Sequence, residues 1–576
     1  MNPPSAQFTL RAIEDLKNAD PVLASHVRVL GYLKPGDGGG GDFQWEQGST
    51  EPQDFGLIFE STSALNNGRW KRIGAGDINV RWFGAQGDWQ ENKPAQGTDD
   101  YEALLHAAAR LTAMGKGTLY FPPGTYRIGR YKDGTKTGPN VANDIIFRNC
   151  DGLHIKGYGA KVDVNGDFGR TPTNMLSAVE PLVFLGCRNV TIEGLELDGN
   201  VDDTTRVAGV TQGGSGIIFG GGSSQYTLTD LYVHHFANDG IYLGMSSPPF
   251  SNAAQKIADK NATLRNVRSK FNARNALSII SLNGGTFDNC EFAESGHSCG
   301  AYGFDSPGAG VDIEPQFGLK STDLVFSDCK FVNNSGSGID ISSGPVSFQR
   351  CLFWGTEGYS IIIASNVVLN PDKTYSISDV TDARDVTFED CEIFGECLSD
   401  FADPTAMPKF RCCHFEDKEF PANGKVFRTA PPYGACVVTN LGNIQLEACL
   451  VVGNRTRALH LPQPVRIANS SAIYQHALSN SSVIHRFSGL PVKIGNTSYD
   501  HQSMLIEVAV SNVRFMEDMY PPIPPPTPPA PVPPPNQKSI WFIAVPPHPQ
   551  IAAPVYVDGP YVRWAQPKVM TPQVIA

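Results

Sequence analysis

The segment Phe326-Ser-Asp-Cys329-Lys-Phe331 is followed 22 positions later by Phe348-Gln-Arg-Cys351-Leu-Phe353. Each reads as an apolar residue, two others, a cysteine, one further residue and a second apolar residue. Four more segments share all or part of this pattern: Phe147-Arg-Asn-Cys150, Phe287-Asp-Asn-Cys290-Glu-Phe292, Phe388-Glu-Asp-Cys391-Glu-Ile393 and Leu446-Glu-Ala-Cys449-Leu-Val451. Cys290 and Cys329 are 39 residues apart and Cys351 and Cys391 are 40 apart, and we count each of these two spacings as two rungs. The resulting period of about twenty residues is typical of a stacked β-solenoid.

Composition agrees with a β-rich solenoid and excludes several classes of protein. The 576 residues include 58 glycines, and only 18% of them are charged, which suits many turns and little helix. The net charge is −12 and no basic run is present, so we predict no nucleic-acid partner. No apolar run is long enough for a membrane span, so we predict no membrane insertion. An acidic balance leaves a polysaccharide partner open.

The twelve cysteines mostly occupy one position of the repeat, between apolar neighbours. This placement favours small apolar thiols stacked inside a coil over disulfides. In the adjacent pair Cys412-Cys413, alternation along a strand lets at most one side chain point inward. No Cys-x-x-Cys pair with matching histidines appears, and we predict no metal site and no cofactor.

Changes in composition predict four parts of the chain. Residues 1–76 form a small head with a glycine-rich turn, Gly36–Asp42. Residues 77–515 form the solenoid, entered through a capping helix at about 99–113, with Asp99 and Glu102 spaced as a capping box. Residues 516–536 read as a stiff proline-rich linker and 537–576 as a small β tail.

The start of the solenoid carries a resemblance to a known family. Phe83-Gly-Ala-Gln-Gly-Asp88, Thr98-Asp-Asp100 and Phe121-Pro-Pro-Gly-Thr-Tyr126 resemble the opening of the pectate-lyase-like superfamily. The head, with Gly31-Tyr32 and Gly68-Arg-Trp70, is similar to the short domain that precedes the helix in many phage tailspike depolymerases. This resemblance implies an all-β right-handed parallel β-helix and, as in tailspikes, a homotrimer.

The resemblance also implies a setting and a range of activities. The resemblance implies an extracellular or virion-tail location. Residues 1–26 contain neither the basic region nor the apolar core of a secretory signal, so we expect either release by another route, such as assembly into a virus particle and lysis, or a signal that has been removed. A capsule or O-antigen depolymerase acting on a bacterial surface polysaccharide is the preferred function. The superfamily contains lyases, hydrolases and epimerases, so the resemblance leaves the reaction open.

A second strand of each rung can be aligned through its Gly/Asn approach. The alignment places Ile241, Leu277, Val311 and Ile339 inward, and therefore Tyr242, Ser278, Asp312 and Asp340 outward. Rungs stack about 4.8 Å apart, so Asp312 and Asp340 become outward neighbours, with Glu314 about 6.6 Å along the strand from Asp312.

We predict Asp312, Glu314 and Asp340 as the catalytic groups. Close carboxylates raise one another's pKa, so that one can donate a proton while another stays ionised. Glycoside hydrolysis needs such a pair, at about 5–5.5 Å for retention and about 6.5–9.5 Å for inversion. Both spacings fit the three positions, so the stereochemistry stays open.

Further residues are predicted to contact substrate. Asp239 and Arg274 lie one or two rungs earlier at the edge of the acidic patch, with Tyr242 and Asn275 on the aligned strands. Tyr302 belongs to a long insertion whose aromatic side chains suit stacking on sugar rings. Of the adjacent His234 and His235, alternation lets at most one face the patch, and we assign substrate contact to His235.

Two alternatives to hydrolysis remain. A polysaccharide lyase would need a base and a group that neutralises a uronate; Arg274, a histidine of the 234–235 pair, Tyr242 or Tyr302 would serve, and the acids would then hold Ca²⁺. The arginine-rich pattern of pectate lyases and the Gly-His-Gly pattern of polygalacturonases are both absent. The other alternative is a non-catalytic glycan-binding fibre or adhesin.

Overall fold

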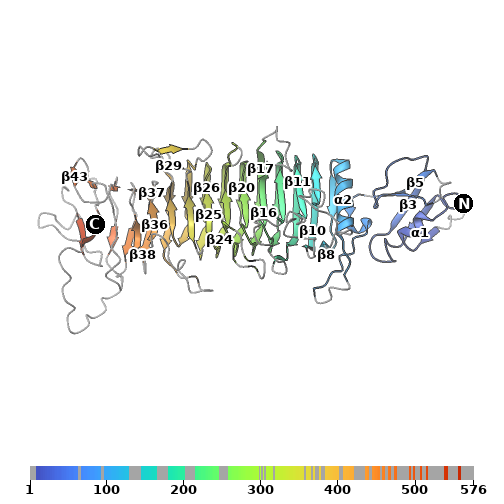
Figure 1. Ribbon diagram of the computed structural model, residues 1–576, viewed down its shortest axis with the longest axis horizontal. Helices are drawn as coiled ribbons and strands as arrows, with labels where there is room; N and C mark the ends of the chain where they lie inside the picture. The colour runs from blue at the N-terminus through green and yellow to red at the C-terminus, as the bar shows by residue number, and fades with distance from the viewer. Residues whose placement is uncertain are drawn as a thin grey trace, which may run out of the picture. The chain divides into compact units, whose positions relative to one another are not determined.

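A computed structural model describes the chain from residue 8 to residue 453 and, beyond that, a set of short strands that ends at residue 558. The longest gaps in the described part are 129–143, 165–179, 202–213, 246–256 and 421–434, and shorter ones interrupt other loops. The chain divides into two compact units, residues 1–274 with 298–305, and residues 275–297 with 306–576. Figure 1 shows that strands of successive rungs lie side by side within each unit.

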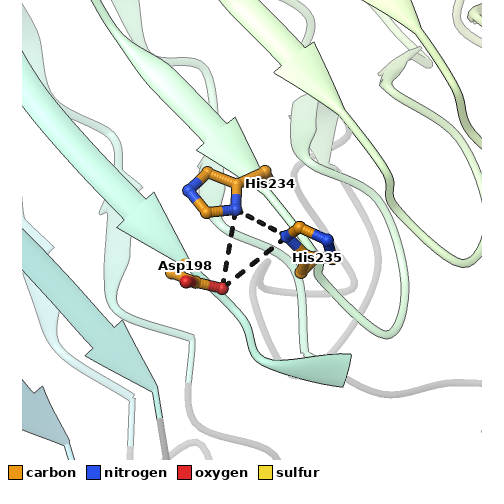
Figure 2. Close-up of side chains that lie close together, drawn as sticks. All are labelled: Asp198, His234 and His235. Atoms are coloured by element: carbon orange, nitrogen blue, oxygen red, sulfur yellow. Dashed lines mark hydrogen bonds and ion pairs between the residues drawn. The ribbon is translucent and has the colours of Figure 1, made fainter. Parts of the chain in front are cut away.

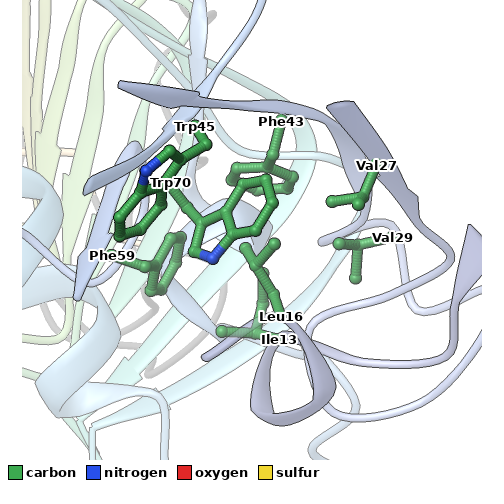
Figure 3. Close-up of a cluster of buried hydrophobic side chains, with 8 residues drawn as sticks. All are labelled: Ile13, Leu16, Val27, Val29, Phe43, Trp45, Phe59 and Trp70. Carbon is green, nitrogen blue, oxygen red and sulfur yellow. The ribbon is translucent and has the colours of Figure 1, made fainter. Parts of the chain in front are cut away.

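The head is a five-stranded sheet closed by one short helix. The strand order is β1-β2-β3-β5-β4. Its core is aromatic: Trp45 and Trp70 meet edge to face with ring centroids 5.3 Å apart (Figure 3). The elements are Phe8–Leu10 (β1), Ile13–Lys17 (α1), His26–Val29 (β2), Gly41–Gln47 (β3), Ile58–Glu60 (β4) and Gly68–Arg72 (β5).

The glycine-rich turn of the head is organised by one carboxylate. Asp37 accepts hydrogen bonds from the backbone N–H groups of Tyr32, Leu33, Lys34 and Gly39, at 2.7 to 3.0 Å. Burial raises the pKa of Asp37, but the four backbone donors outweigh burial and lower it. The predicted glycine-rich turn is therefore organised around the Asp37 carboxylate.

The capping helix is Tyr101–Met114 (α2), close to the predicted 99–113. The predicted capping box is wrong. Asp100 is the N-cap residue, and its carboxylate accepts from the N–H groups of Gln86 and Gly87 at 2.7 and 3.1 Å instead of capping its own helix. Burial raises the pKa of Asp100 to about 7. The helix thereby fastens the strand-turn segment before it, and it ends at Gly115, whose φ of 72° suits glycine.

The first unit contains parallel sheets whose rungs run in register. One sheet has the order β9-β11-β13-β16 and the other carries the remaining long strands. The strands of the first are Ile146–Arg148 (β9), Leu182–Leu185 (β11), Ile217–Gly220 (β13) and Ile241–Met245 (β16). Those of the second are Ile78–Asn79 (β6), Gly117–Tyr120 (β7), Gly124–Ile128 (β8), Asp151–Val164 (β10), Arg188–Asp198 (β12), Ser224–Thr229 (β14), Tyr232–His234 (β15), Asp259–Arg265 (β17) and Arg268–Lys270 (β18). The 3₁₀ turn Val80–Phe83 (η1) leads into them.

The second unit repeats the same arrangement. One sheet has the order β39-β36-β33-β28-β25-β22-β19. These strands are Leu277–Ile279 (β19), Val311–Ile313 (β22), Ser337–Ile341 (β25), Tyr359–Ile363 (β28), Cys397–Ser399 (β33), Ala435–Thr439 (β36) and Arg457–His460 (β39). The strands that carry the repeated Cys segments are Leu282–Asp288 (β20), Glu291–Ala293 (β21), Thr322–Ser327 (β23), Lys330–Val332 (β24), Val346–Gln349 (β26), Leu352–Trp354 (β27), Val386–Glu389 (β31), Glu392–Phe394 (β32), Lys409–Arg411 (β34), His414–Glu416 (β35), Ile444–Glu447 (β37) and Leu450–Gly453 (β38).

The phenylalanines of the repeat stack into a ladder. Phe326 pairs in register with Phe287 and Phe348, and the ring centroids are 4.2 and 5.0 Å apart. The ladder continues through Phe388 and Phe410 at 4.5 and 4.4 Å. Because Phe287 pairs directly with Phe326, the 39-residue spacing is one rung with an insertion. The prediction of two rungs for the spacings of 39 and 40 is therefore wrong.

The thiols form a second ladder beside the rings. All twelve cysteines are free, and only Cys412 is exposed. Five thiols of the second unit each contact a backbone carbonyl of the preceding rung: Cys329, Cys351, Cys391, Cys413 and Cys449. The distance from Cys329 Sγ to Phe287 O, for example, is 3.4 Å. The predicted stack of unbridged thiols and the inward position of only Cys413 in its pair are confirmed. Phe147 is the exception among the six segments, because it lies in β9 and stacks on Phe184 in the other sheet.

The residue before each repeat cysteine turns the chain at a corner. Asn289, Asp328 and Asp390 have φ of 49°, 56° and 53°, the left-handed region that Asn and Asp tolerate best. Arg350, Cys412 and Ala448 adopt the same conformation at the equivalent corners. The corner geometry therefore recurs rung by rung, even where the side chain does not favour it.

The remaining strands form an insertion between two rungs and a continuation of the parallel ladder toward the C-terminus. Val367–Leu369 (β29) and Tyr375–Ile377 (β30) form a hairpin. The later strands are Val465–Ala468 (β40), Ala472–Gln475 (β41), Val492–Ile494 (β42), Thr497–Tyr499 (β43), Ile506–Val508 (β44), Arg514–Met516 (β45), Lys538–Phe542 (β46) and Val555–Asp558 (β47). β46 and β47 pair within the predicted β tail. The predicted proline-rich linker lies, beyond Met516, outside the described residues.

Among the helices described, none has the length and apolar content to cross a membrane.

Replacing Phe348 by alanine is expected to destabilise the second unit by about 3–5 kcal/mol, because it removes a fully buried ring from the middle of the ladder. Thermal and guanidinium unfolding of the full chain measure the effect. Phe8→Ala is the control: that ring is 48% exposed, and its loss should change stability by less than about 0.5 kcal/mol. Equal midpoints for wild type and Phe348→Ala would contradict the ladder as a stabilising element.

Candidate functional site

The structure brings the predicted carboxylates together on adjoining rungs of the second unit. Asp312 on β22 pairs in register with Asp340 on β25, and Val311 pairs with Ile339. The apolar residues at these positions, Val311 and Ile339, are fully buried, so the predicted inward side of both strands is confirmed.

Asp312 is less open than predicted. It is only 2% exposed, and its Oδ2 accepts a hydrogen bond from Asn275 Nδ2 at 3.3 Å. Asn275 is itself fully buried; it also donates to Ser278 Oγ at 3.1 Å and accepts from Ala309 N–H at 2.8 Å. The expectation of a solvent-facing Asp312 and a substrate-facing Asn275 is therefore wrong, because both side chains are buried and hydrogen-bond to each other across adjacent rungs.

Asp340 and Glu314 form an unequal pair of half-buried carboxyl groups. Asp340 Oδ1 is buried and has no hydrogen-bond partner within the described residues. Burial, and next the negative charge of Glu314, raise the pKa of Asp340 to about 7. At neutral pH Asp340 thus holds a proton part of the time beside a second carboxyl group, which is the arrangement that general acid catalysis requires.

The remaining predicted residues that the structure describes belong to the first unit. Asp239 is fully buried, and both of its oxygens accept from Arg274 Nη1, at 3.1 and 2.9 Å. The expectation of Asp239 at an open edge is wrong, because its side chain is fully buried. The ion pair with Arg274 supplies the partner charge that a buried carboxylate requires. Tyr242 packs against the buried residues Val183 and Ile218. Tyr302 lies outside the described residues. The joining of these residues with the acidic patch into one site stays a prediction.

A groove on the first unit was missed by the sequence analysis. It has a volume of about 560 Å³, and its lining includes Lys161, Glu196, Tyr232 and Arg268. These four residues stand on one column in register, across β10, β12, β15 and β18. Their spacing in the chain is 35 or 36 residues. This period of 35 or 36 residues is visible in the sequence and indicates the column. It was missed because a period near twenty was assumed.

The next column of the same strands gathers Asp198, His234 and His235 (Figure 2). His234 Nδ1 lies 2.6 Å from His235 Nδ1 and 3.5 Å from Asp198 Oδ1. The strand alternation assumed for this pair does not hold, because Nδ1 of both histidines approaches Asp198 Oδ1, at 3.5 and 3.9 Å. Contact of either histidine with the acidic patch or with substrate stays a prediction. His235 follows the end of β15 with a φ of 55°, so the strand alternation no longer applies to it.

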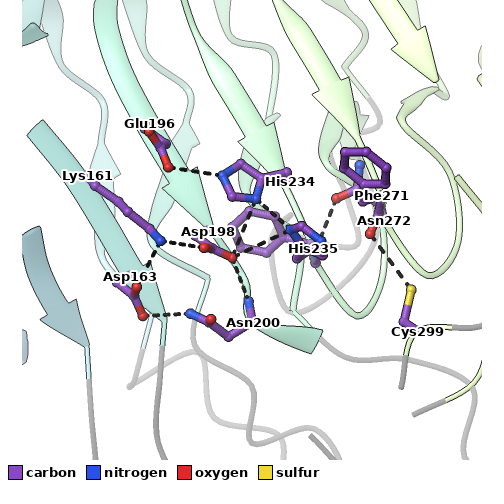
Figure 4. A network of polar contacts seen from close by, with 11 residues as sticks. Lys161, Asp163, Glu196, Asp198, Asn200, His234, His235, Phe271, Asn272 and Cys299 are labelled. Atoms are coloured by element: carbon purple, nitrogen blue, oxygen red, sulfur yellow. Dashed lines mark hydrogen bonds and ion pairs between the residues drawn. The ribbon is translucent and has the colours of Figure 1, made fainter. Parts of the chain in front are cut away.

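A polar network surrounds this cluster (Figure 4). Lys161 Nζ bonds the carboxylates of both Asp163, at 3.1 Å, and Asp198, at 2.5 Å. Asn200 donates its backbone N–H to Asp198 Oδ1 at 3.0 Å and its side-chain amide to Asp163 at 2.6 Å. The side chain of Asp198 is therefore held in place from two sides.

Comparisons with known proteins agree with the fold. Residues 184–370 match the model of the right handed beta helix region, and residues 9–75 match the phage tail protein small four-stranded beta-sheet domain. Among curated proteins, no sequence is similar enough to count as a match. The prediction of an all-β chain with a right-handed parallel β-helix and an N-terminal head is confirmed.

Several solved structures are similar to the chain. A tailspike protein from the Acinetobacter baumannii bacteriophage Fri1, described as a capsular polysaccharide depolymerase, is 14% identical, with a TM-score of 0.43, over 81% of this chain and 75% of that one. A full-length tailspike protein 2 from an Escherichia coli O157:H7 bacteriophage is 14% identical, with a TM-score of 0.41, over 77% of this chain. The match covers 51% of that tailspike. The A-module of a mannuronan C-5 epimerase from Azotobacter vinelandii is 12% identical, with a TM-score of 0.37, over 69% and 95%.

Asp340→Asn is expected to make the protein more stable than wild type at pH 8, but not at pH 4. Because the folded-state pKa of Asp340 is raised, its protonated form stabilises the fold at low pH, and this contribution is lost as the pH rises through about 7. Asparagine removes that loss, on the order of 2–4 kcal/mol. Unfolding midpoints at both pH values measure it.

The exposed Asp323→Asn serves as the matched control, with no pH-dependent difference expected from wild type. A difference between Asp340→Asn and wild type that stays the same at both pH values would contradict a raised pKa at Asp340.

Proposed function

We propose that the protein is a phage tail depolymerase that hydrolyses glycosidic bonds of a bacterial surface polysaccharide. Its head matches a phage tail domain and its body a right-handed β-helix, an architecture that presents long, rigid outer surfaces. A virion-tail location and a homotrimeric assembly belong to the same proposal. The single observation that carries the reaction is the buried, unpaired carboxyl oxygen of Asp340 beside the charge of Glu314.

The two carboxyl groups divide the reaction between them. Asp340, with its raised pKa, donates its proton to the glycosidic oxygen as the bond from that oxygen to the anomeric carbon breaks. Glu314 acts on the anomeric carbon, either through a water molecule whose proton it takes or directly as a nucleophile. Asp312, fixed by Asn275 and paired in register with Asp340, is a positioning residue.

Two observations bear on the alternatives. A lyase needs a cation to neutralise the uronate, but Arg274 already forms an ion pair with the buried Asp239. A purely binding function finds support in the groove of Tyr232 and Arg268, since aromatic and guanidinium groups both suit a sugar chain. Cleavage products distinguish these alternatives from hydrolysis.

The full chain should shorten at least one polysaccharide in a panel of purified capsules and O-antigens, leaving new reducing ends without unsaturated sugars. Mass spectrometry and absorbance at the ultraviolet edge measure the two products. Asp340→Asn and Glu314→Gln should each reduce the rate by about 10²–10⁴, while Asp323→Asn keeps it. The basic limb of the pH profile should fall near pH 7, where Asp340 loses its proton.

Unsaturated ends would replace hydrolysis by a lyase reaction. Saturable binding to a glycan that is never shortened would support the adhesin. Unchanged cleavage by both acid variants would show that the catalytic site lies elsewhere on the chain.

A further inference from the structure

We propose that Asp198, His234 and His235 form a binding site for one divalent transition-metal ion of the Zn²⁺ type. Two imidazole nitrogens and one carboxylate oxygen are a donor set that such ions prefer. The three donor atoms, His234 Nδ1, His235 Nδ1 and Asp198 Oδ1, lie within 4.8 Å of one another (Figure 2). Ions of this type sit about 2.0–2.2 Å from nitrogen and oxygen donors, so small side-chain rotations close the shell.

The hydrogen bonding of His234 prepares it as a ligand. Its Nε2 lies 3.3 Å from Glu196 Oε1, and since an ionised carboxylate can only accept, Nε2 carries the proton. The lone pair of Nδ1 then points toward His235 and Asp198. A carboxylate behind a metal-binding histidine fixes the tautomer and strengthens the ligand, which is the role that Glu196 takes here.

Stacking holds both imidazole rings in place. The His234 ring stacks on Tyr232 with centroids 4.1 Å apart, and the His235 ring stacks on Phe271 at 5.2 Å and 14°. Asp198 is held by Lys161 and Asn200, as described above. All three donors are therefore positioned by neighbours outside the cluster, so little ordering is left for the ion to impose.

The charges around the cluster leave room for a cation. The carboxylates of Glu196 and Asp198 contact the two histidines. Lys161 binds Asp198 and the neighbouring Asp163, and Lys270 pairs in register with His234, so the carboxylates outnumber the cations by one. A divalent ion would balance the remaining negative charge in a partly buried place, where an uncompensated charge is costly. The side chain of His235 is 29% exposed, compared with 6% for His234, so an ion and its water ligand have access from that side.

The competing arrangement has no metal. At 2.6 Å, His235 Nδ1–H would then donate to His234 Nδ1, and the cluster would be an ordinary hydrogen-bonded pair. The two arrangements differ in what they predict. A metal ion ties the end of β12 to the end of β15, so its binding raises the resistance of the first unit to unfolding.

The site is tested by isothermal titration calorimetry, in which Zn²⁺ is added to the full-length protein after treatment with a chelator. All proteins carry Cys412→Ser, because that thiol is the one exposed cysteine and would bind zinc by itself. We expect one ion per chain, a higher unfolding midpoint with Zn²⁺, and visible absorption bands with Co²⁺ that lack a sulfur-to-metal band.

Three variants separate the site from adventitious binding. His235→Asn loses the ligand while keeping a residue that tolerates a φ of 55°, and it should weaken binding at least tenfold without unfolding. Glu196→Gln should weaken binding about 10–100-fold through His234. His154→Ala is the matched control, because His154 bonds Glu193 at 2.9 Å outside the cluster; it should leave binding unchanged.

The proposal is overturned if Zn²⁺ does not bind, or if His235→Asn binds it as tightly as the control does. Equal affinity for Ca²⁺ and Zn²⁺ would also overturn it, because Ca²⁺ selects oxygen donors and not imidazole. These readouts do not depend on polysaccharide cleavage, so the result holds whether or not the acidic pair is catalytic.

Discussion

In-register stacking of identical positions on successive rungs is the constraint on which the structure depends. Phe326 pairs with Phe287 on one side and Phe348 on the other, and the Cys329 thiol contacts the Phe287 carbonyl of the rung before it. Stacking apolar side chains at one register position excludes water from the coil and leaves the alternate positions outside. The same register therefore places Asp312 beside Asp340, and Asp198 beside His234.

Much of the fold could be predicted because it follows from local repetition. The apolar-x-x-Cys pattern identified the inner ladder, and the Gly/Asn alignment identified the register of Val311 with Ile339. Rung counting failed where an insertion imitated a second rung, between Cys290 and Cys329. Sequence spacing cannot distinguish a loop from a rung of equal length, since only backbone pairing tells them apart.

The candidate sites were predicted less completely, for two physical reasons. Burial depends on what covers a strand from outside, and Asn275 lies against Asp312 because of a contact between rungs that alternation alone does not describe. The His234–His235 pair was misread because His235 has left the strand conformation. The backbone conformation at a corner and the burial of an outward-facing side chain depend on tertiary contacts. Whether a side chain points inward or outward depends on the local period of the strand.

The recurrent left-handed corner before each repeat cysteine restricts how this protein can change during evolution. A β-branched residue is poorly tolerated there, since its side chain collides with its own backbone at a φ near 53°. Deleting one residue inside a strand would turn every later side chain of that strand to the opposite face, whereas loss of an entire coil would join two matching corners. We therefore expect related sequences to differ in length mainly by whole coils and by loop insertions, with the corner positions kept in phase.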